Sequence, residues 1–115
     1  VTWPQRFPSP AAELDLAKYG KITFGRPDEK TFRCLAACRR AMEKGGLAPA
    51  AANGANEVAV KLFLDGKISF PEIGELVCNA VGRQSRGSGN LTVEDILAAD
   101  ADARAYVLDF IDSQR

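Results

Sequence analysis

The stretch that decides the fold runs from Pro49 to Val60 and reads P-A-A-A-N-G-A-N-E-V-A-V. Alanine is the best helix former, and Pro49 can occupy a first helical turn, where its missing N–H costs nothing. We therefore expect a helix from Pro49 to about Asp65, with a core face made of Ala55, Val58, Ala59, Leu62 and Phe63. Gly54 costs about 1 kcal/mol inside a helix. Either the helix begins after it, or another backbone approaches closely there.

Helical spacing also marks the segments on both sides. Before this stretch we expect a helix from about Thr31 to Lys44, capped by Asp28 or Thr31, with an apolar stripe of Phe32, Leu35, Cys38 and Met42. After it, Ser69 and Glu72 form a capping-box pattern. The third helix should run to about Gly82, with an apolar stripe of Ile73, Leu76, Val77, Ala80 and Val81.

The C-terminal part predicts a loop and two more helices. Residues 83–90 hold no apolar side chain and two glycines, which is typical of a mobile loop. Thr92 and Asp95 resemble a capping box for a short helix to about Ala98. Asp100 can cap a last helix, residues 101–111, with Ala103, Tyr106, Val107, Phe110 and Ile111 along one side. The fold class is thus mostly α, a small bundle resembling a four-helix bundle over residues 29–115.

Residues 1–28 have a different character. Three prolines within the first ten residues disfavour a helix. Alternating apolar residues predict short strand segments at Leu14–Leu16 and Ile22–Phe24, too short to make a stable sheet alone. We expect an extended linker that lies against a part of the protein outside this sequence. The lack of an initiator Met is in line with a chain cut from something longer.

Composition excludes several function classes. The 115 residues hold 15 acidic and 15 basic side chains, so the formal net charge is zero and a nucleic-acid partner is disfavoured. No apolar run approaches the roughly 20 residues of a membrane span. The three cysteines indicate reduced thiols in a compartment like the cytosol. The chain has no histidine, so it lacks the commonest general base and metal ligand.

Four polar groups are candidate sites. Asn53, Asn56 and Glu57 share helical faces and could bind a ligand, although a structural polar cluster that holds the helix to a neighbour is the favoured interpretation. Cys34 and Cys38 could supply half of a zinc site, but two small buried side chains are favoured. A solvated loop is favoured over an anion nest for the run with Arg83, Arg86, Gly87 and Gly89. Capping is favoured over acid–base chemistry for Asp95, Asp100 and Asp102.

The order of these motifs resembles one enzyme family through nearly the whole chain. Residues 48–60 resemble the A-P-x-x-x-N-A-A-N-E-x-A-V segment of 1-deoxy-D-xylulose 5-phosphate reductoisomerases. Further matches are Leu14-Asp15-Leu16, Ile22-Thr23-Phe24, Pro27-Asp28, Cys34-Leu35-Ala36, residues 67–73 (K-I-S-F-P-E-I) and residues 93–104 (V-E-D-I-L-A-A-D-A-D-A-R). Trp3-Pro4-Gln5-Arg6 resembles the end of the family's catalytic region.

The resemblance implies a C-terminal helical domain after a linker, residues 1–28, that leads from the family's catalytic domain. The parent would use NADPH and a divalent metal, Mg or Mn, to make 2-C-methyl-D-erythritol 4-phosphate for isoprenoids in the non-mevalonate route. It would be a homodimer in the cytoplasm, or in a plastid-type organelle of a eukaryote. The family's G-S-T-G-S-I-G, S-E-H and N-K-x-x-E segments are absent from this chain. We therefore assign no catalytic, cofactor-binding or metal-binding residue to it.

In this interpretation the bundle braces the catalytic domain and is inactive alone. Two other classes stay open. An independent helical binding module would expose an apolar groove that a hydrophobic dye detects. A self-contained enzyme using Glu57 or an aspartate with the cysteines would lose turnover on Glu57→Gln.

Overall fold

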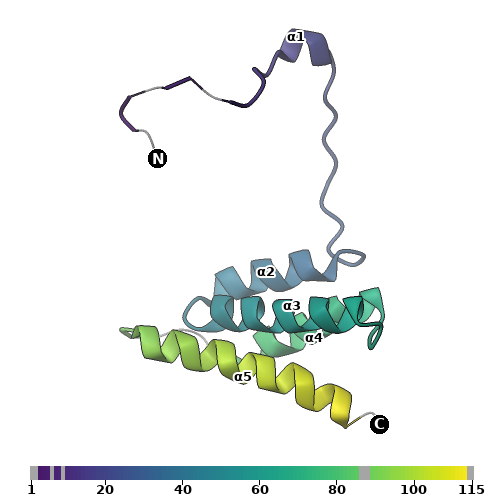
Figure 1. Cartoon of the computed structure of the whole chain (residues 1–115), viewed down its shortest axis with the longest axis vertical. Coiled ribbons are helices and arrows are strands. Elements are labelled where there is room, and N and C mark those ends of the chain that lie inside the picture. Colours follow the sequence, from purple (N-terminus) through teal and green to yellow (C-terminus); the bar gives the residue numbers. More distant parts are fainter. Residues whose placement is uncertain (1–2, 6, 9, 86–88, 114–115) are drawn as a thin grey trace.

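The computed structural model describes residues 3–5, 7–8, 10–85 and 89–113. Within that part, one short helix precedes a bundle of four longer helices (Figure 1). The helices are α1 (Leu16–Tyr19), α2 (Arg33–Lys44), α3 (Ala48–Leu64), α4 (Phe70–Arg83) and α5 (Val93–Asp112). The expectation of a mostly α-helical bundle is therefore confirmed. None of these helices is long and apolar enough to cross a membrane.

Helix α3 lies at the centre of the bundle. It contacts α2, α4 and α5, while α2 and α5 do not contact each other. In Figure 1, α2 and the preceding linker lie on one side of α3, and α5 lies on the other. The bundle therefore presents two opposite outer faces.

The core is built mainly from small side chains. Ten of the buried apolar residues in the described part of the chain are alanines, and the largest fully buried side chains there are Leu76, Val77, Val81 and Val107. Glycines let the helices approach closely at two crossings. A Cβ atom on Gly54 would lie 2.7 Å from the Asp100 carbonyl oxygen of α5, and one on Gly74 would lie 2.7 Å from Cβ of Arg33 in α2. Of the two explanations for Gly54, the close approach of another backbone is correct.

Helices α3 and α4 follow the sequence patterns closely. Pro49 lies in the first turn of α3, and most of the predicted core face is buried. At the start of α4, the Glu72 carboxylate accepts hydrogen bonds from the backbone N–H and the hydroxyl of Ser69, both at 2.6 Å. All five residues of the predicted α4 stripe are buried. Local signals were enough here because capping and periodicity agree.

The predicted break before Asp100 is wrong. Helix α5 runs without interruption from Val93 to Asp112. Its N-terminal capping box is as expected: Asp95 N donates to Thr92 Oγ1 at 3.2 Å, and Thr92 N donates to Asp95 Oδ2 at 2.9 Å. Asp100 does not cap a helix, because its carboxylate accepts hydrogen bonds from Arg104 one turn later.

Helix α2 departs from prediction in its start and in its buried face. Asp28 caps the turn before the helix, and α2 begins at Arg33 without a side-chain cap. The predicted apolar stripe does not enter the core: Phe32 and Met42 are 61% and 73% exposed. Ala37 and Ala41 are buried instead. Their small side chains let α2 pack closely, so its larger apolar residues remain outside.

The linker contains a helix where the sequence pattern suggested strands. Neither Leu14–Leu16 nor Ile22–Phe24 forms a strand, and among the described residues no other strand is present. Asp15 accepts hydrogen bonds from Ala17 N at 3.0 Å and Lys18 N at 3.2 Å, and so starts the four-residue helix α1. A strand needs a neighbour for its hydrogen bonds, and this segment has none within the described chain.

Candidate functional site

The most connected polar group centres on Arg104. From α5, its guanidinium donates from Nε to Asp100 Oδ2 at 2.6 Å and from Nη2 to Asp100 Oδ1 at 3.2 Å. Its Nη2 also donates to Glu57 Oε2 of α3 at 2.7 Å. Asn53 Nδ2 completes the group by donating to Glu57 Oε1 at 3.3 Å. We call Asn53, Glu57, Asp100 and Arg104 the polar cluster; it joins α3 to α5.

Electrostatic interactions in the polar cluster keep the Glu57 carboxylate and the Arg104 guanidinium charged. The hydrogen bond from Arg104, together with its positive charge and the Asn53 amide, lowers the pKa of Glu57. The two carboxylates in turn raise the pKa of Arg104 above its ordinary value. A carboxylate held ionised in this way is a poor general acid or base near neutral pH. The arrangement suits helix-to-helix attachment better than proton transfer.

The side chain of Asn56 is not hydrogen-bonded to the polar cluster. The structure brings Asn53 and Glu57 together, but the side chain of Asn56 lines two hollows beside α2 and makes no hydrogen bond with the described residues. Asn53 also lines one of these hollows, so the three residues that the sequence grouped together stay close, but only Asn53 and Glu57 are joined by a hydrogen bond.

The three cysteines lie near one another without forming a metal site. Burial, more than the neighbouring thiols Cys38 and Cys78, raises the pKa of Cys34. The Cys78 thiol donates to the Arg33 carbonyl oxygen at 3.6 Å. Throughout the described ranges, no group of three His, Cys, Asp or Glu side chains could hold a metal ion. The favoured interpretation of two buried side chains is wrong for Cys38, which is exposed, while Cys34 is half-buried.

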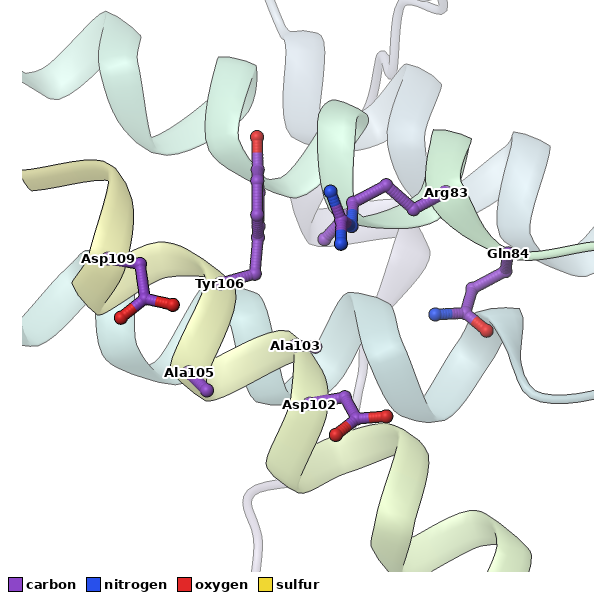
Figure 2. Close-up of a pocket in the computed structure, with 8 residues that line it drawn as sticks. Arg83, Gln84, Asp102, Ala103, Ala105, Tyr106 and Asp109 are labelled. Atoms are coloured by element: carbon purple, nitrogen blue, oxygen red, sulfur yellow. The ribbon is translucent and has the colours of Figure 1, made fainter. Parts of the chain in front are cut away.

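The candidate acidic group is dispersed. Asp95 caps α5 and Asp100 belongs to the polar cluster, while Asp102 lines a separate open hollow of about 610 Å³ between α4 and α5 (Figure 2). There the Arg83 guanidinium carbon lies 4.7 Å from the centre of the Tyr106 ring. The described residues of the lining offer charges, but none of them is a histidine, cysteine or serine that could act as a nucleophile.

The C-terminal end of α4 differs from the sequence prediction in two ways. Arg83 belongs to α4 rather than to a loop, while Arg86 and Gly87 lie outside the described residues. Lys44 of α2 donates hydrogen bonds to three carbonyl oxygens there, those of Val81 at 2.9 Å, Gly82 at 3.1 Å and Gln84 at 2.6 Å. Sequence reasoning missed Lys44, because its partners lie some forty positions away. It could have found the Asp100–Arg104 pair from the spacing of four.

A small α-helical bundle preceded by a segment that holds one short helix is thus the class of domain that the chain defines. Residues 1–106 match the family described as the DXP reductoisomerase C-terminal domain. The chain belongs to this family.

Relatives and solved structures agree with the family. The protein named 1-deoxy-D-xylulose 5-phosphate reductoisomerase from Chloroherpeton thalassium is 42% identical over 113 residues, covering 98% of this chain and 29% of the relative. The protein of that name from Caulobacter vibrioides is 44% identical over 107 residues, covering 93% of this chain and 26% of the relative. The structure of the Zymomonas mobilis reductoisomerase in complex with NADPH superposes with a TM-score of 0.81 at 34% identity, covering 96% of this chain and 29% of that one. The structure of a DOX-P reductoisomerase in complex with magnesium superposes with a TM-score of 0.76 at 32% identity. It covers 97% of this chain and 30% of that one. This chain thus spans less than a third of the length of these proteins.

Proposed function

We propose that this chain is the C-terminal structural domain of an NADPH-dependent 1-deoxy-D-xylulose 5-phosphate reductoisomerase, which serves isoprenoid biosynthesis. The observation that carries the proposal is the extent of the match. Nearly the whole chain aligns with the Chloroherpeton protein, but 98% of this chain corresponds to only 29% of that relative. The parent enzyme would then convert 1-deoxy-D-xylulose 5-phosphate to 2-C-methyl-D-erythritol 4-phosphate, and this domain would not be catalytic alone.

The residues present do not fit the cofactors that the family implies. NADPH needs a seat for its pyrophosphate, typically a glycine-rich turn between a strand and a helix, and no strand exists in the described part of the chain. A divalent metal such as Mg or Mn needs several oxygen ligands, but Glu57 and Asp100 are both held by Arg104. We therefore place both cofactors in the rest of the enzyme.

The role left for this domain is to brace the catalytic domain, with residues 1–28 as the linker between them. The linker holds large apolar side chains that a free tail would not need, and Leu14, Leu16, Ile22 and Phe24 are all exposed here. In the parent these residues would pack against the catalytic domain, where the short strand segments would find a partner. Hydrogen exchange of the intact enzyme tests this. If residues 14–24 exchange as fast as an unfolded peptide, the bracing role is wrong.

The remaining assignments concern the parent. We propose a homodimer in the cytoplasm, since the similar proteins come from bacteria, or in a plastid-type organelle if the source is a eukaryote. The zero net charge gives no reason to add a nucleic-acid partner.

The decisive experiment measures NADPH oxidation with 1-deoxy-D-xylulose 5-phosphate in three samples: this chain, the separately expressed remainder of its parent, and the two mixed. We expect activity only in the mixture. Activity of this chain alone would contradict the proposal, and full activity of the remainder alone would leave the domain without a bracing role.

An independent helical binding module remains the second candidate, and the exposed apolar residues of α2 favour it. It predicts that the chain binds a partner unrelated to the reductoisomerase and that the mixture gains no activity.

A further inference from the structure

An apolar groove runs along the bundle between α2 and α3, and residues of α4 also line it. It consists of two adjoining hollows of about 480 and 490 Å³, which share Cys34 and Asn56 as lining residues. Met42 lines the hollow at one end, and Phe32 lines the hollow at the other. We call this surface the α2–α3 groove.

The large apolar side chains along this groove are exposed to solvent. Phe32, Met42 and Phe70 are 61%, 73% and 69% exposed, and Val60 of α3 is also exposed. The two fully buried residues of α2 are alanines, and its larger apolar side chains face outward. Exposed apolar surface of this kind marks an interaction site more often than it marks plain solvent contact.

Asn56 indicates what kind of group the occupant presents. Its half-buried amide sits where the two hollows meet and makes no hydrogen bond with any described residue. An asparagine amide offers two N–H donors and one acceptor, the set that pairs with the main chain of a peptide. An occupant with free main-chain groups beside its apolar side chains would satisfy it.

The charged residues of the groove indicate which charge its occupant carries. Lys30 and Arg33 line the groove, and none of the other described residues that line it is acidic. Arg33 has only a loose partner, since its Nη1 lies 3.9 Å from Glu75 Oε1 with both side chains about half exposed. Helix α2 as a whole carries four basic side chains and one acidic one, whereas α5 carries six acidic ones and one basic one. The groove therefore favours a carboxylate, and the opposite face of the bundle does not.

The linker leaves the bundle at this groove. Lys30 and Thr31, which follow the linker directly, both line it. In Figure 1 the linker departs on the α2 side, away from α5. Whatever precedes the linker in the parent is therefore tethered next to the groove, at a high effective concentration.

We propose that the α2–α3 groove is the surface by which this bundle docks on the catalytic domain of the reductoisomerase. Its occupant is a segment of that domain with apolar side chains, a carboxylate that faces Lys30 and Arg33, and main-chain groups that bond Asn56. The inference rests on the proposed function and adds to it the face and the chemistry of the contact.

Thiol alkylation of the intact enzyme tests the choice of face. Cys38 lines the groove and is exposed in this chain, and Leu97→Cys places a matched probe on the outer face of α5, where Leu97 is 64% exposed. The rate at each site is measured by peptide mass spectrometry in the intact enzyme and in this chain alone. We expect Cys38 to react at least about tenfold more slowly in the intact enzyme, and the α5 probe to react equally in both.

Variants of the intact enzyme supply the second measurement. Phe32→Glu should break the contact between the groove and the catalytic domain, and so restore the fast alkylation of Cys38. Leu97→Glu, at a position of similar exposure, should leave Cys38 protected. If Cys38 stays reactive while the α5 probe is protected, the face is wrong although the bracing role stands. If neither probe is protected, the bundle does not pack on the rest of the enzyme, and the proposed function fails with the inference.

Discussion

Leu76→Ala in α4 should destabilise the bundle more than any surface change. The Leu76 side chain is 1% exposed and is one of the four largest side chains that are completely buried in the described part of the chain. The substitution removes three carbon atoms, which is about 2.4 kcal/mol of transfer free energy at about 0.8 kcal/mol each. The cavity left behind adds to this, so we expect a loss of about 3 kcal/mol. Leucine and alanine have similar helix propensities, so nearly all of the loss reports packing.

The matched control is Leu97→Ala in α5, since Leu97 is 64% exposed. It should change the free energy of unfolding by no more than about 0.5 kcal/mol. Urea unfolding followed by circular dichroism at 222 nm measures both variants. In a domain of this size the Leu76 variant should also melt about 12–24 °C lower. A loss below about 1 kcal/mol at Leu76, or equal losses at both sites, would refute the assignment of Leu76 to the core.

Three further predictions address the helix contacts and the fixed carboxylates. Gly54→Val should cost about 2 kcal/mol more than Gly82→Val in the same urea assay, because only the first places a Cβ 2.7 Å from a backbone oxygen; equal costs would contradict the close crossing. Lys44→Met should cost about 1–2 kcal/mol by removing the donor to three carbonyl oxygens at the end of α4, and no loss would show that water replaces it. Hydrogen bonds lower the pKa of Glu57 and Glu72 in the folded state from the ordinary 4.5. In acid the unfolded state therefore binds more protons than the folded state. The stabilisation from these two carboxylates is complete above about pH 4.5, and it is lost as the pH falls through their lower folded pKa values. Glu72→Gln should flatten this acid limb of stability against pH, and an unchanged limb would count against the capping box.

The parts of the fold that the sequence predicts well depend on neighbours along the chain. Pro49 and the alanines after it specify α3, and Ser69 with Glu72 specifies the start of α4, because each signal acts within one or two turns. Asp100 misled the prediction, since an aspartate before an apolar stripe is typical of a cap. Its true partner in the structure is the Arg104 side chain one turn later, which also reaches Glu57 on another helix.

Helix α2 shows a different kind of failure. Apolar spacing identified a stripe through Phe32 and Met42, but hydrophobicity alone does not say whether a stripe faces the core or another molecule. The buried face belongs to Ala37 and Ala41, which contribute little to such a pattern. Likewise, the alternation in the linker was real, but no pattern in this chain supplies the neighbouring strand that it would need.

The central place of α3 has a consequence for how this domain tolerates change. Because α2 and α5 never touch, substitutions on the two outer helices should act independently, and a double-mutant cycle between them should show almost no interaction energy. Positions on α3 are constrained from three sides at once, so pairs that include them should be coupled. The domain can therefore evolve its two faces separately, as long as the helix between them keeps its shape.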